Sequence, residues 1–330
     1  MIPEPFEELL LRHWGIHGPV NASLIRDDPF RQTWWIRSRN GHMMMKWLGD
    51  ARQNDRATNS LRLSHWATTQ GAPVVQVLPT NDGAECLVLD NGTLAIFEYV
   101  DATVGVSDWR ALGRAVGRLH TVSVPEFAQR SALSPETAIP LAASRLEAFL
   151  SESRHDQDLA EHVSQSLDIL QKLPSFRDLP IGLIHTDLGI AHTMTRTTGE
   201  ITFLDTLGIG IGPLILDLAP IACEHLSHLD THGSASRLNA EAAWDFLGEY
   251  IRFRAPSSCE PAMLRPAHQA YEIIQAAHYL DLFRRSGNQE MLTRAHAYFH
   301  WLGYVEEMVE RDLIPLIERG LREMAEREED

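Results

Sequence analysis

Two tight-turn sequences near the start of the chain constrain the fold more than any other feature. Arg39-Asn40-Gly41 and Asp90-Asn91-Gly92 each separate two short apolar runs. Asn and Gly tolerate the positive φ of a tight turn, so each sequence predicts a hairpin of two antiparallel strands. The four strands are expected at residues 33–37, 42–47, 86–89 and 94–98. Apolar positions at helical spacing predict one helix between the hairpins, at 54–69, and another before them, at 5–14.

After residue 100 the pattern changes from strands to helices. Helices are expected at residues 109–120, 138–153, 158–172, 240–253, 266–285 and 291–319, with a further one from Leu216. A strand-rich segment followed by a helical one is an α+β arrangement. We therefore expect an N-terminal lobe at residues 1–99 and a C-terminal lobe at residues 100–330, with a ligand cleft between them.

The composition excludes several classes of protein. The chain has 330 residues, a 44% hydrophobic composition and a formal net charge of −16. That size buries a large core, and the acidic balance argues against a nucleic-acid surface, which needs clustered Lys and Arg. No run reaches the ~18 apolar residues of a membrane span, the start does not resemble a signal peptide, and three cysteines are too few for a disulfide framework. We expect a cytoplasmic protein whose partners are small molecules.

Two aspartates in the helical half carry the clearest chemical signal. Asp187 lies in the sequence His185-Thr186-Asp187, and Asp205 directly follows the apolar run 201–204. Phosphoryl transfer needs one carboxylate that orients and deprotonates a hydroxyl and another that holds the metal on the nucleotide phosphates. The spacing therefore predicts phosphoryl-transfer chemistry. The competing interpretation is that both aspartates cap turns.

This block resembles the aminoglycoside phosphotransferase and choline kinase superfamily, which shares the protein-kinase fold. The family's loop reads His-Gly-Asp-Leu-x-x-x-Asn, followed by Ile-Asp-Trp and then Gly-Asp-Pro-x-x-Asp-Leu-Ala. The matching segments are His185-Thr186-Asp187-Leu188, Leu204-Asp205-Thr206 and Gly212-Pro213-Leu214-Ile215-Leu216-Asp217-Leu218-Ala219. Weaker resemblances at residues 71–75, 97–100 and 113–122 extend the similarity over most of the chain. The resemblance implies a strand-rich N-terminal lobe and a mainly helical C-terminal lobe.

The resemblance also implies a role for each polar residue of the block. Asp187 is the catalytic base, and Asp205 binds Mg²⁺, a hard ion that prefers carboxylate and phosphate oxygens. Lys46 contacts the nucleotide phosphates, although a solvent-facing strand lysine is a common alternative. His185 braces the loop, and Asp217 anchors the loop backbone unless it only caps the helix that follows.

The binding partners follow from the same resemblance. The co-substrate is ATP or GTP with Mg²⁺, and backbone groups of Glu98 and Val100 contact the nucleobase. The acceptor is a small molecule. The residues expected to line its pocket are Glu224, His225, Asp230 and Tyr279. A helix core or a solvated face is the competing interpretation for each of these four.

Two departures from the family's pattern concern the metal and the lysine. His192 stands where the second metal ligand is usually Asn, and imidazole is a poorer partner for Mg²⁺ than an oxygen ligand. Some macrolide phosphotransferases resemble this chain at that position, so His192 favours their branch. A packing histidine is the alternative. Ser60 lies where the helix should present a carboxylate to Lys46, which would leave the lysine less well held.

Two further departures concern loops. The loop expected over the phosphates, residues 27–31, lacks glycine and is therefore a poor backbone cradle. Thr206 and Pro213 replace the usual Trp and Asp. The alternating glycines Gly208, Gly210 and Gly212 do not form a dinucleotide-binding fingerprint and are expected to permit a tight loop.

The sequence therefore predicts a small-molecule phosphotransferase. It would move the γ-phosphoryl group of ATP or GTP to a hydroxyl of an antibiotic-like acceptor, an aminoglycoside or a macrolide, and so confer antibiotic resistance. A metabolite kinase acting on choline, homoserine or a sugar is the second prediction. A catalytically inactive family member that binds a nucleotide or ligand is the third, favoured by His192, Ser60 and the glycine-free loop.

Overall fold

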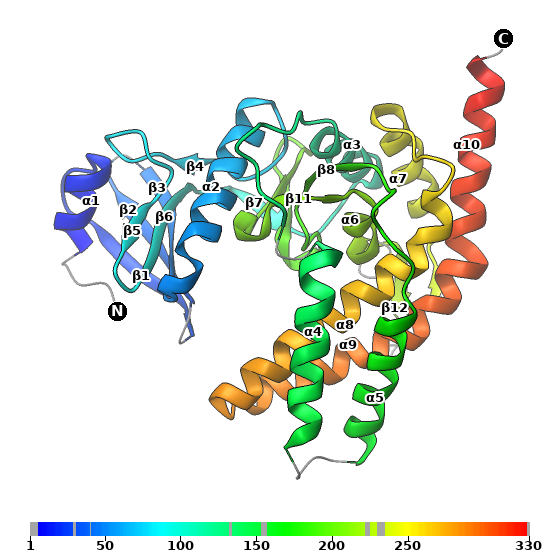
Figure 1. Cartoon of the computed structure of the whole chain (residues 1–330). Helices are drawn as coiled ribbons and strands as arrows, with labels where there is room; N and C mark the ends of the chain where they lie inside the picture. Colours follow the sequence, from blue (N-terminus) through cyan, green and yellow to red (C-terminus); the bar gives the residue numbers. More distant parts are fainter. Residues whose placement is uncertain are drawn as a thin grey trace.

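An antiparallel sheet near the N-terminus is followed by a mostly helical region, which confirms the α+β arrangement (Figure 1). The computed structural model describes residues 6–28, 31–39, 41–131, 134–152, 157–221, 225–229 and 235–328. Within these residues, no helix is both long and apolar enough to cross a membrane.

The N-terminal sheet contains both predicted hairpins. Its strands are β1 (Asn21–Asp28), β2 (Arg31–Ser38), β3 (Gly41–Leu48), β4 (Val77–Leu78), β5 (Leu87–Leu89) and β6 (Gly92–Glu98). The order is β1-β2-β3-β6-β4, and β5 pairs with β6. The strand β1 was not expected from the sequence. It is an edge strand with exposed side chains, so it has no alternation of buried and exposed residues from which it could be predicted.

The alternation of side chains along β3 places Lys46 on one face of this sheet. Met43, Met45 and Trp47 are buried on the other face, against the helix α1 (Phe6–Trp14). Met44 contacts a second apolar cluster on the same face as Lys46, beside the helix α2 (Asn54–Thr69). The β3 lysine therefore points away from the α1 core, toward the helical region.

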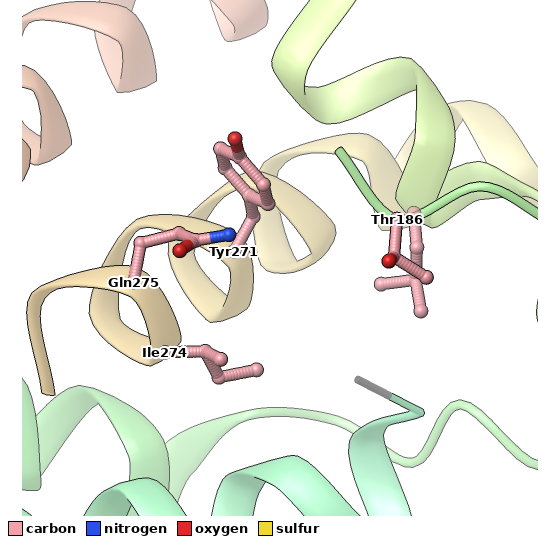
Figure 2. A pocket seen from close by; sticks show the side chains of 5 residues that line it. Thr186, Tyr271, Ile274 and Gln275 are labelled. Atoms are coloured by element: carbon pink, nitrogen blue, oxygen red, sulfur yellow. The ribbon is translucent and has the colours of Figure 1, made fainter. Parts of the chain in front are cut away.

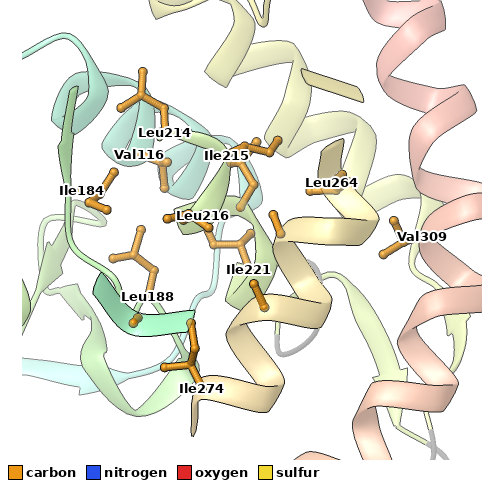
Figure 3. Close-up of a cluster of buried hydrophobic side chains, with 14 of the residues drawn as sticks. Val116, Ile184, Leu188, Leu214, Ile215, Leu216, Ile221, Leu264, Ile274 and Val309 are labelled. Atoms are coloured by element: carbon orange, nitrogen blue, oxygen red, sulfur yellow. The ribbon is translucent and has the colours of Figure 1, made fainter. Parts of the chain in front are cut away.

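The helical region is built around one long helix. Its helices are α3 (Trp109–His120), α4 (Pro135–Ser151), α5 (Gln157–Lys172), α6 (Ile215–Pro220), α7 (Ala240–Phe253), α8 (Glu260–Ser286), α9 (Gln289–Met308) and α10 (Ile314–Glu328). The helix α8 packs against α4, α6 and α9. Figure 3 shows apolar side chains from α3, α6 and α8 filling the space behind the segment 184–188.

Two of the predicted helices have different ends in the structure, and proline is the reason in both cases. Pro266 was interpreted as the start of α8, but the helix begins at Glu260 with Pro261 in its first turn. A single helix at 291–319 is also wrong. A π-helical turn, Val309–Leu313, separates α9 from α10. Pro315 has no N–H to donate to the preceding turn, which accounts for the break.

Five short strands bring the predicted site residues together. The strand β8 (Ile181–Ile184) pairs with β11 (Gly210–Pro213), and β9 (Thr193–Arg196) pairs with β10 (Ile201–Phe203) and with β7 (Ala102–Val104). A further hairpin, β12 (Ser227–Leu229) with β13 (Ala235–Leu238), precedes α7. The loop 185–192 connects β8 to β9, and Asp205 follows β10 within two residues. Asp187 therefore lies in the loop that leads into β9, and Asp205 follows β10, the strand paired with β9.

Candidate active site

Asp217 holds the backbone of the loop that carries Asp187. Its two carboxylate oxygens accept hydrogen bonds from the backbone N–H groups of His185, at 2.8 Å, and Thr186, at 2.7 Å. His120 Nε2 lies 3.3 Å from Asp217 Oδ2, and both side chains are fully buried. Charge-assisted hydrogen bonds in a buried site are among the stronger ones. This geometry is that of a loop anchor and not of a helix cap.

The anchor is itself held by a buried chain of polar groups. His120 Nδ1 lies 3.0 Å from the Tyr250 hydroxyl oxygen, which accepts a hydrogen bond from Arg254 at 2.9 Å. Arg254 in turn donates to Glu260 at the start of α8. The loop is thereby connected to α3, α7 and α8 through side chains that are distant in sequence.

His185 joins this loop to the hairpin that precedes Asp205. Its Nε2 donates to the carbonyl oxygen of Leu204 at 2.8 Å. Burial lowers the pKa of His185, so the ring is neutral and donates from one nitrogen only. On the other side of the hairpin, the Leu204 N–H donates to the carbonyl oxygen of His192 at 2.8 Å. These contacts fit the expectation that His185 braces the loop against the hairpin.

Two residues of the site adopt a left-handed backbone conformation. Among the described residues other than glycine, only Thr186, with φ 75°, and Asp205, with φ 58°, have a positive φ. This conformation costs on the order of 1–3 kcal/mol and persists where the surroundings enforce it. Both strained residues adjoin the candidate catalytic groups, which fits a site whose geometry is maintained by the fold.

Asp187 and Asp205 are bridged by one histidine. His192 Nδ1 lies 3.1 Å from Asp187 Oδ2, and its Nε2 lies 3.7 Å from Asp205 Oδ2. Burial lowers the pKa of His192, but the hydrogen bond and the charge of Asp187 outweigh burial, and the pKa is raised. The ring is therefore biased toward the cationic form that two carboxylates favour.

Cations from the N-terminal sheet complete the surroundings of Asp205. Lys46 Nζ donates to Asp205 Oδ1 at 3.1 Å, and an Arg31 nitrogen lies 3.8 Å from Oδ2. Burial alone would raise the pKa of the Asp205 carboxyl, but these charges, with Lys46 first, outweigh it and hold the pKa well below its usual range. Asp205 is therefore ionised. From the sequence, Arg31 was expected only as part of the loop over the phosphates, which lacks glycine.

The donor set at this point fits Mg²⁺ in part. The ionised carboxylate of Asp205 is a suitable ligand for a hard ion that also takes phosphate and water oxygens. His192 fits less well, because its ring is committed to Asp187 and its raised pKa favours a protonated nitrogen. Within the described parts of the chain, no group of three or more His, Cys, Asp or Glu side chains could hold a metal by itself. Phosphate oxygens would have to complete the site.

Tyr271, on α8, is a further neighbour of the candidate base. Its hydroxyl lies 3.5 Å from Asp187 Oδ1. With Thr186, Ile274 and Gln275 it lines a cavity of about 20 Å³, room for roughly one water molecule (Figure 2). Figure 2 shows Thr186 opposite the α8 side chains. An acceptor molecule is too large for this cavity.

The residues predicted to contact the nucleobase lie at the end of β6. The Glu98 side chain pairs with Arg196 at 2.7 Å, which ties the end of β6 to β9. Val100 is buried in an apolar cluster with Phe97, and partly buried Met44 and Leu204 pack against that cluster.

The residues predicted to line the acceptor pocket have different positions. Glu224 and Asp230 lie outside the described residues. His225 is buried, and its Nε2 lies 3.0 Å from the carbonyl oxygen of Leu188. That position behind the loop favours a supporting role over contact with an acceptor. Tyr279 is half-buried on α8 and stacks on Tyr298, with ring centroids 5.6 Å apart.

The departures from the family's pattern also have structural explanations. The Ser60 hydroxyl donates to the carbonyl oxygen of Ile209 at 2.9 Å, and Lys46 pairs with Asp205 instead of a carboxylate on α2. The alternating glycines are not needed for a tight turn, because none of them has a positive φ. A Cβ on Gly210 would lie 2.4 Å from the Ser131 backbone, and one on Gly208 would lie 2.6 Å from Thr186. Close packing requires them.

The fold is shared with solved kinases of small molecules. A spectinomycin phosphotransferase complexed with ADP and spectinomycin aligns with a TM-score of 0.62 and 17% identity, over 97% of this chain and 99% of that one. A microcompartment-associated aminopropanol kinase aligns with a TM-score of 0.60 and 16% identity, over 94% and 98%. An ethanolamine kinase of Plasmodium vivax aligns with a TM-score of 0.59 and 12% identity, over 84% and 81%.

These similarities establish the fold, which is protein-kinase-like as predicted. No curated protein sequence matches the chain. The profile described as "Phosphotransferase enzyme family" matches residues 28–255, which is more than half of the chain and includes Lys46, Asp187, His192, Asp205 and Asp217. The chain therefore belongs to the phosphotransferase enzyme family.

Proposed function

We propose that this protein transfers the γ-phosphoryl group of ATP or GTP to a hydroxyl of a small molecule. The observation that carries the proposal is the convergence of Asp187, His192, Asp205 and Lys46, joined by contacts of 3.1 to 3.7 Å. These residues come from β3 and from two separate loops. They provide a carboxylate for the hydroxyl, a carboxylate for a metal, and cations for phosphate charge.

Asp187 is the proposed base. It would accept the proton of the acceptor hydroxyl as the oxygen attacks the γ-phosphorus and the bond to the departing nucleoside diphosphate breaks. Asp205 would hold Mg²⁺, which neutralises phosphate charge when bound. Lys46 and Arg31 would contact phosphate oxygens, and Glu98 and Val100 would adjoin the nucleobase. In this arrangement, residues 1–99 form the nucleotide-binding lobe and residues 100–330 the acceptor lobe.

Two classes of acceptor are supported by the structural neighbours. The spectinomycin phosphotransferase binds an antibiotic, and another neighbour is an amicoumacin kinase, which aligns with a TM-score of 0.61 and 14% identity over 89% of both chains. These support an antibiotic acceptor such as an aminoglycoside or macrolide. The aminopropanol and ethanolamine kinases support a metabolite acceptor. An inactive ligand-binding protein is disfavoured because Asp187, Asp205 and Lys46, which phosphoryl transfer requires, are all present and lie at one site.

A phosphoryl-transfer assay tests the proposal. Product is measured with ATP and GTP, Mg²⁺, and a panel of aminoglycosides, macrolides, amino alcohols and hydroxy acids. Turnover that disappears in Asp187→Asn, while the variant still binds nucleotide, supports the proposal. Nucleotide binding without transfer to any compound, and without Mg²⁺-dependent hydrolysis of the nucleotide, would support the inactive binding protein instead.

A further inference from the structure

A group of arginines adjoins the candidate active site, and only one of them, Arg31, is used by the proposed chemistry. We define the arginine cluster as Arg31 of β2, Arg56 of α2, Arg145 of α4 and Arg285 of α8. Each is accessible to solvent. The chain as a whole has a net charge of −16. The positive charge of the arginine cluster is therefore opposite in sign to the net charge of the protein. Such a local inversion is a candidate anion site.

A single aspartate beside the cluster, Asp281, is shared by several arginines. Asp281 is shared by Arg145 at 3.7 Å, Arg284 at 3.5 Å and Arg285 at 3.9 Å. Arg284 also pairs with Glu152 at 2.7 Å. Asp281 is therefore shared by several arginines, at distances that are long for an ion pair.

Arg31 and Arg56, the other two arginines of the cluster, also lack a close ion pair with a described residue. Arg31 shares Asp205 with Lys46, and its distance of 3.8 Å is the longer of the two. Arg56 has no ion pair or hydrogen bond with any described residue. Surrounding protein lowers the pKa of Arg56 first, and the charges of Arg31 and Arg145 lower it further. Like charges that lie close together repel each other, and a bound anion would reduce that repulsion.

The long helix α8 connects this cluster to the candidate base. Tyr271, His278 and Arg285 are spaced by seven residues, so they lie on one face of the helix, with roughly 10 Å of axial rise between neighbours. Tyr271 lies 3.5 Å from Asp187. His278 lies among the cluster: burial lowers its pKa to about 4, and the charges of Arg145 and then Arg31 contribute. The helix α8 thus extends from the neighbourhood of Asp187, the candidate base, to the arginine cluster.

We propose that the acceptor alcohol carries an anionic oxyacid group, a carboxylate or a phosphate, which the arginine cluster binds roughly 10 to 20 Å along α8 from Tyr271, the neighbour of the candidate base. This inference rests on the proposed function and narrows its acceptor. Arginine presents two N–H groups in the plane that carboxylate and phosphate oxygens require. A polycationic aminoglycoside would be repelled by the same side chains. The metabolite class of acceptor is therefore favoured over the antibiotic class.

Matched pairs of acceptors test the charge requirement. Transfer from Mg·ATP is measured for hydroxycarboxylates beside their neutral amides, and for phosphate-bearing alcohols beside their dephosphorylated counterparts. The anionic member should have a kcat/KM about 10- to 100-fold higher, and the better of the two series identifies the anion. Equal or faster transfer to the neutral members would overturn the proposal.

Charge-removing variants test the residues. Arg56→Gln and Arg145→Gln should each raise KM for the anionic acceptor about 10- to 100-fold and leave kcat less affected. The matched control is Arg177→Gln, an exposed arginine before β8, which should not change KM. The affinity for Mg·ATP should stay within about twofold of wild type in all three. A rise in the nucleotide Kd as large as the rise in KM would assign the cluster to the phosphates of the donor and overturn the proposal.

A binding measurement separates this inference from the proposed function. Inorganic phosphate and citrate should raise the unfolding temperature of the nucleotide-saturated wild type, but not that of Arg56→Gln. If they do so while no alcohol is phosphorylated, the proposed function is wrong and the anion site remains. If neither ion stabilises the wild type more than the variant, the anion site is wrong, whatever the activity.

Discussion

The two sides of the candidate active site are held in different ways. On the helical side, Asp217 is fully buried and binds two backbone N–H groups of the loop at 2.7 and 2.8 Å. On the sheet side, Lys46 and Arg31 reach Asp205 through partly exposed ion pairs of 3.1 and 3.8 Å. Buried charge-assisted hydrogen bonds fix geometry, whereas exposed ion pairs contribute little. The loop that carries Asp187 is therefore held firmly, while the contacts from the sheet side are the more adjustable ones.

The largest effect is expected from breaking the anchor on the helical side. In Asp217→Asn, one acceptor oxygen becomes an NH₂ group that faces a backbone N–H. The loss of a buried charged acceptor should lower the free energy of unfolding by about 3–5 kcal/mol, measured by urea unfolding. Asp245→Asn, which breaks the exposed pair with Arg110, is the control and should cost less than about 1 kcal/mol. Equal losses in both variants would refute the comparison.

A pH-dependent effect is expected from His225, which supports the same loop. Burial lowers its pKa to about 4, against about 6.5 in the unfolded chain. Between about pH 4 and pH 6.5, His225 takes up a proton in the unfolded chain but not in the folded protein. Stability is therefore lost as the pH falls from about 6.5 to about 4, by roughly 3 kcal/mol for this group.

The variant His225→Gln isolates this contribution. Its amide can still donate to the Leu188 carbonyl oxygen, but it does not titrate. Urea unfolding between pH 7 and pH 4 should show a shallower loss of stability than in wild type. The exposed histidine variant His17→Gln should keep the wild-type slope. A profile for His225→Gln that parallels wild type would show that the ring does not stay neutral when folded.

A smaller effect, on ligand binding, is expected on the sheet side. Lys46→Met removes a cation that would contact nucleotide phosphates, so the Kd for Mg·ATP should rise about 10- to 100-fold. The unfolding temperature should hardly change, because the ion pair with Asp205 is partly exposed. Calorimetric titration and thermal unfolding measure the two quantities, with Lys172→Met on α5 as the control. Large destabilisation with unchanged nucleotide affinity would place Lys46 in the fold and not in the site.

The smallest effect concerns the strained backbone of the loop. Thr186 has φ 75°, a conformation that glycine adopts without strain. Thr186→Gly should therefore raise the free energy of unfolding by about 1 kcal/mol, measured by urea unfolding. Thr198→Gly, at a position without positive φ, should lower it. If both variants lowered stability, the left-handed conformation at Thr186 would not be a source of strain.

The comparison also explains what the sequence could predict. The hairpins, α3 and α7 were predicted because their turn residues and apolar spacing are local signals. His185, Asp187, Asp205 and Asp217 were predicted together because they form one short block whose spacing reflects the chemistry.

Features that depend on distant contacts were not predicted. The strand β1 has no buried face. Arg31 was interpreted as part of a poor phosphate loop, and its ion pair with Asp205 joins residues far apart in the sequence. The chain of contacts from Asp217 through His120 and Tyr250 joins three helices. Local sequence patterns do not predict such contacts, because the residues meet only when the whole chain has packed.

The central claim is that the two carboxylates have separate roles, and paired measurements of kcat and Mg·ATP affinity test it most directly. Asp187→Asn should lower kcat by about 10²- to 10⁴-fold, the usual contribution of a general base, and leave the Kd for Mg·ATP nearly unchanged. Asp205→Asn should abolish the Mg²⁺ dependence of nucleotide binding. Normal turnover in Asp187→Asn, or Mg²⁺-dependent binding retained in Asp205→Asn, would contradict this assignment.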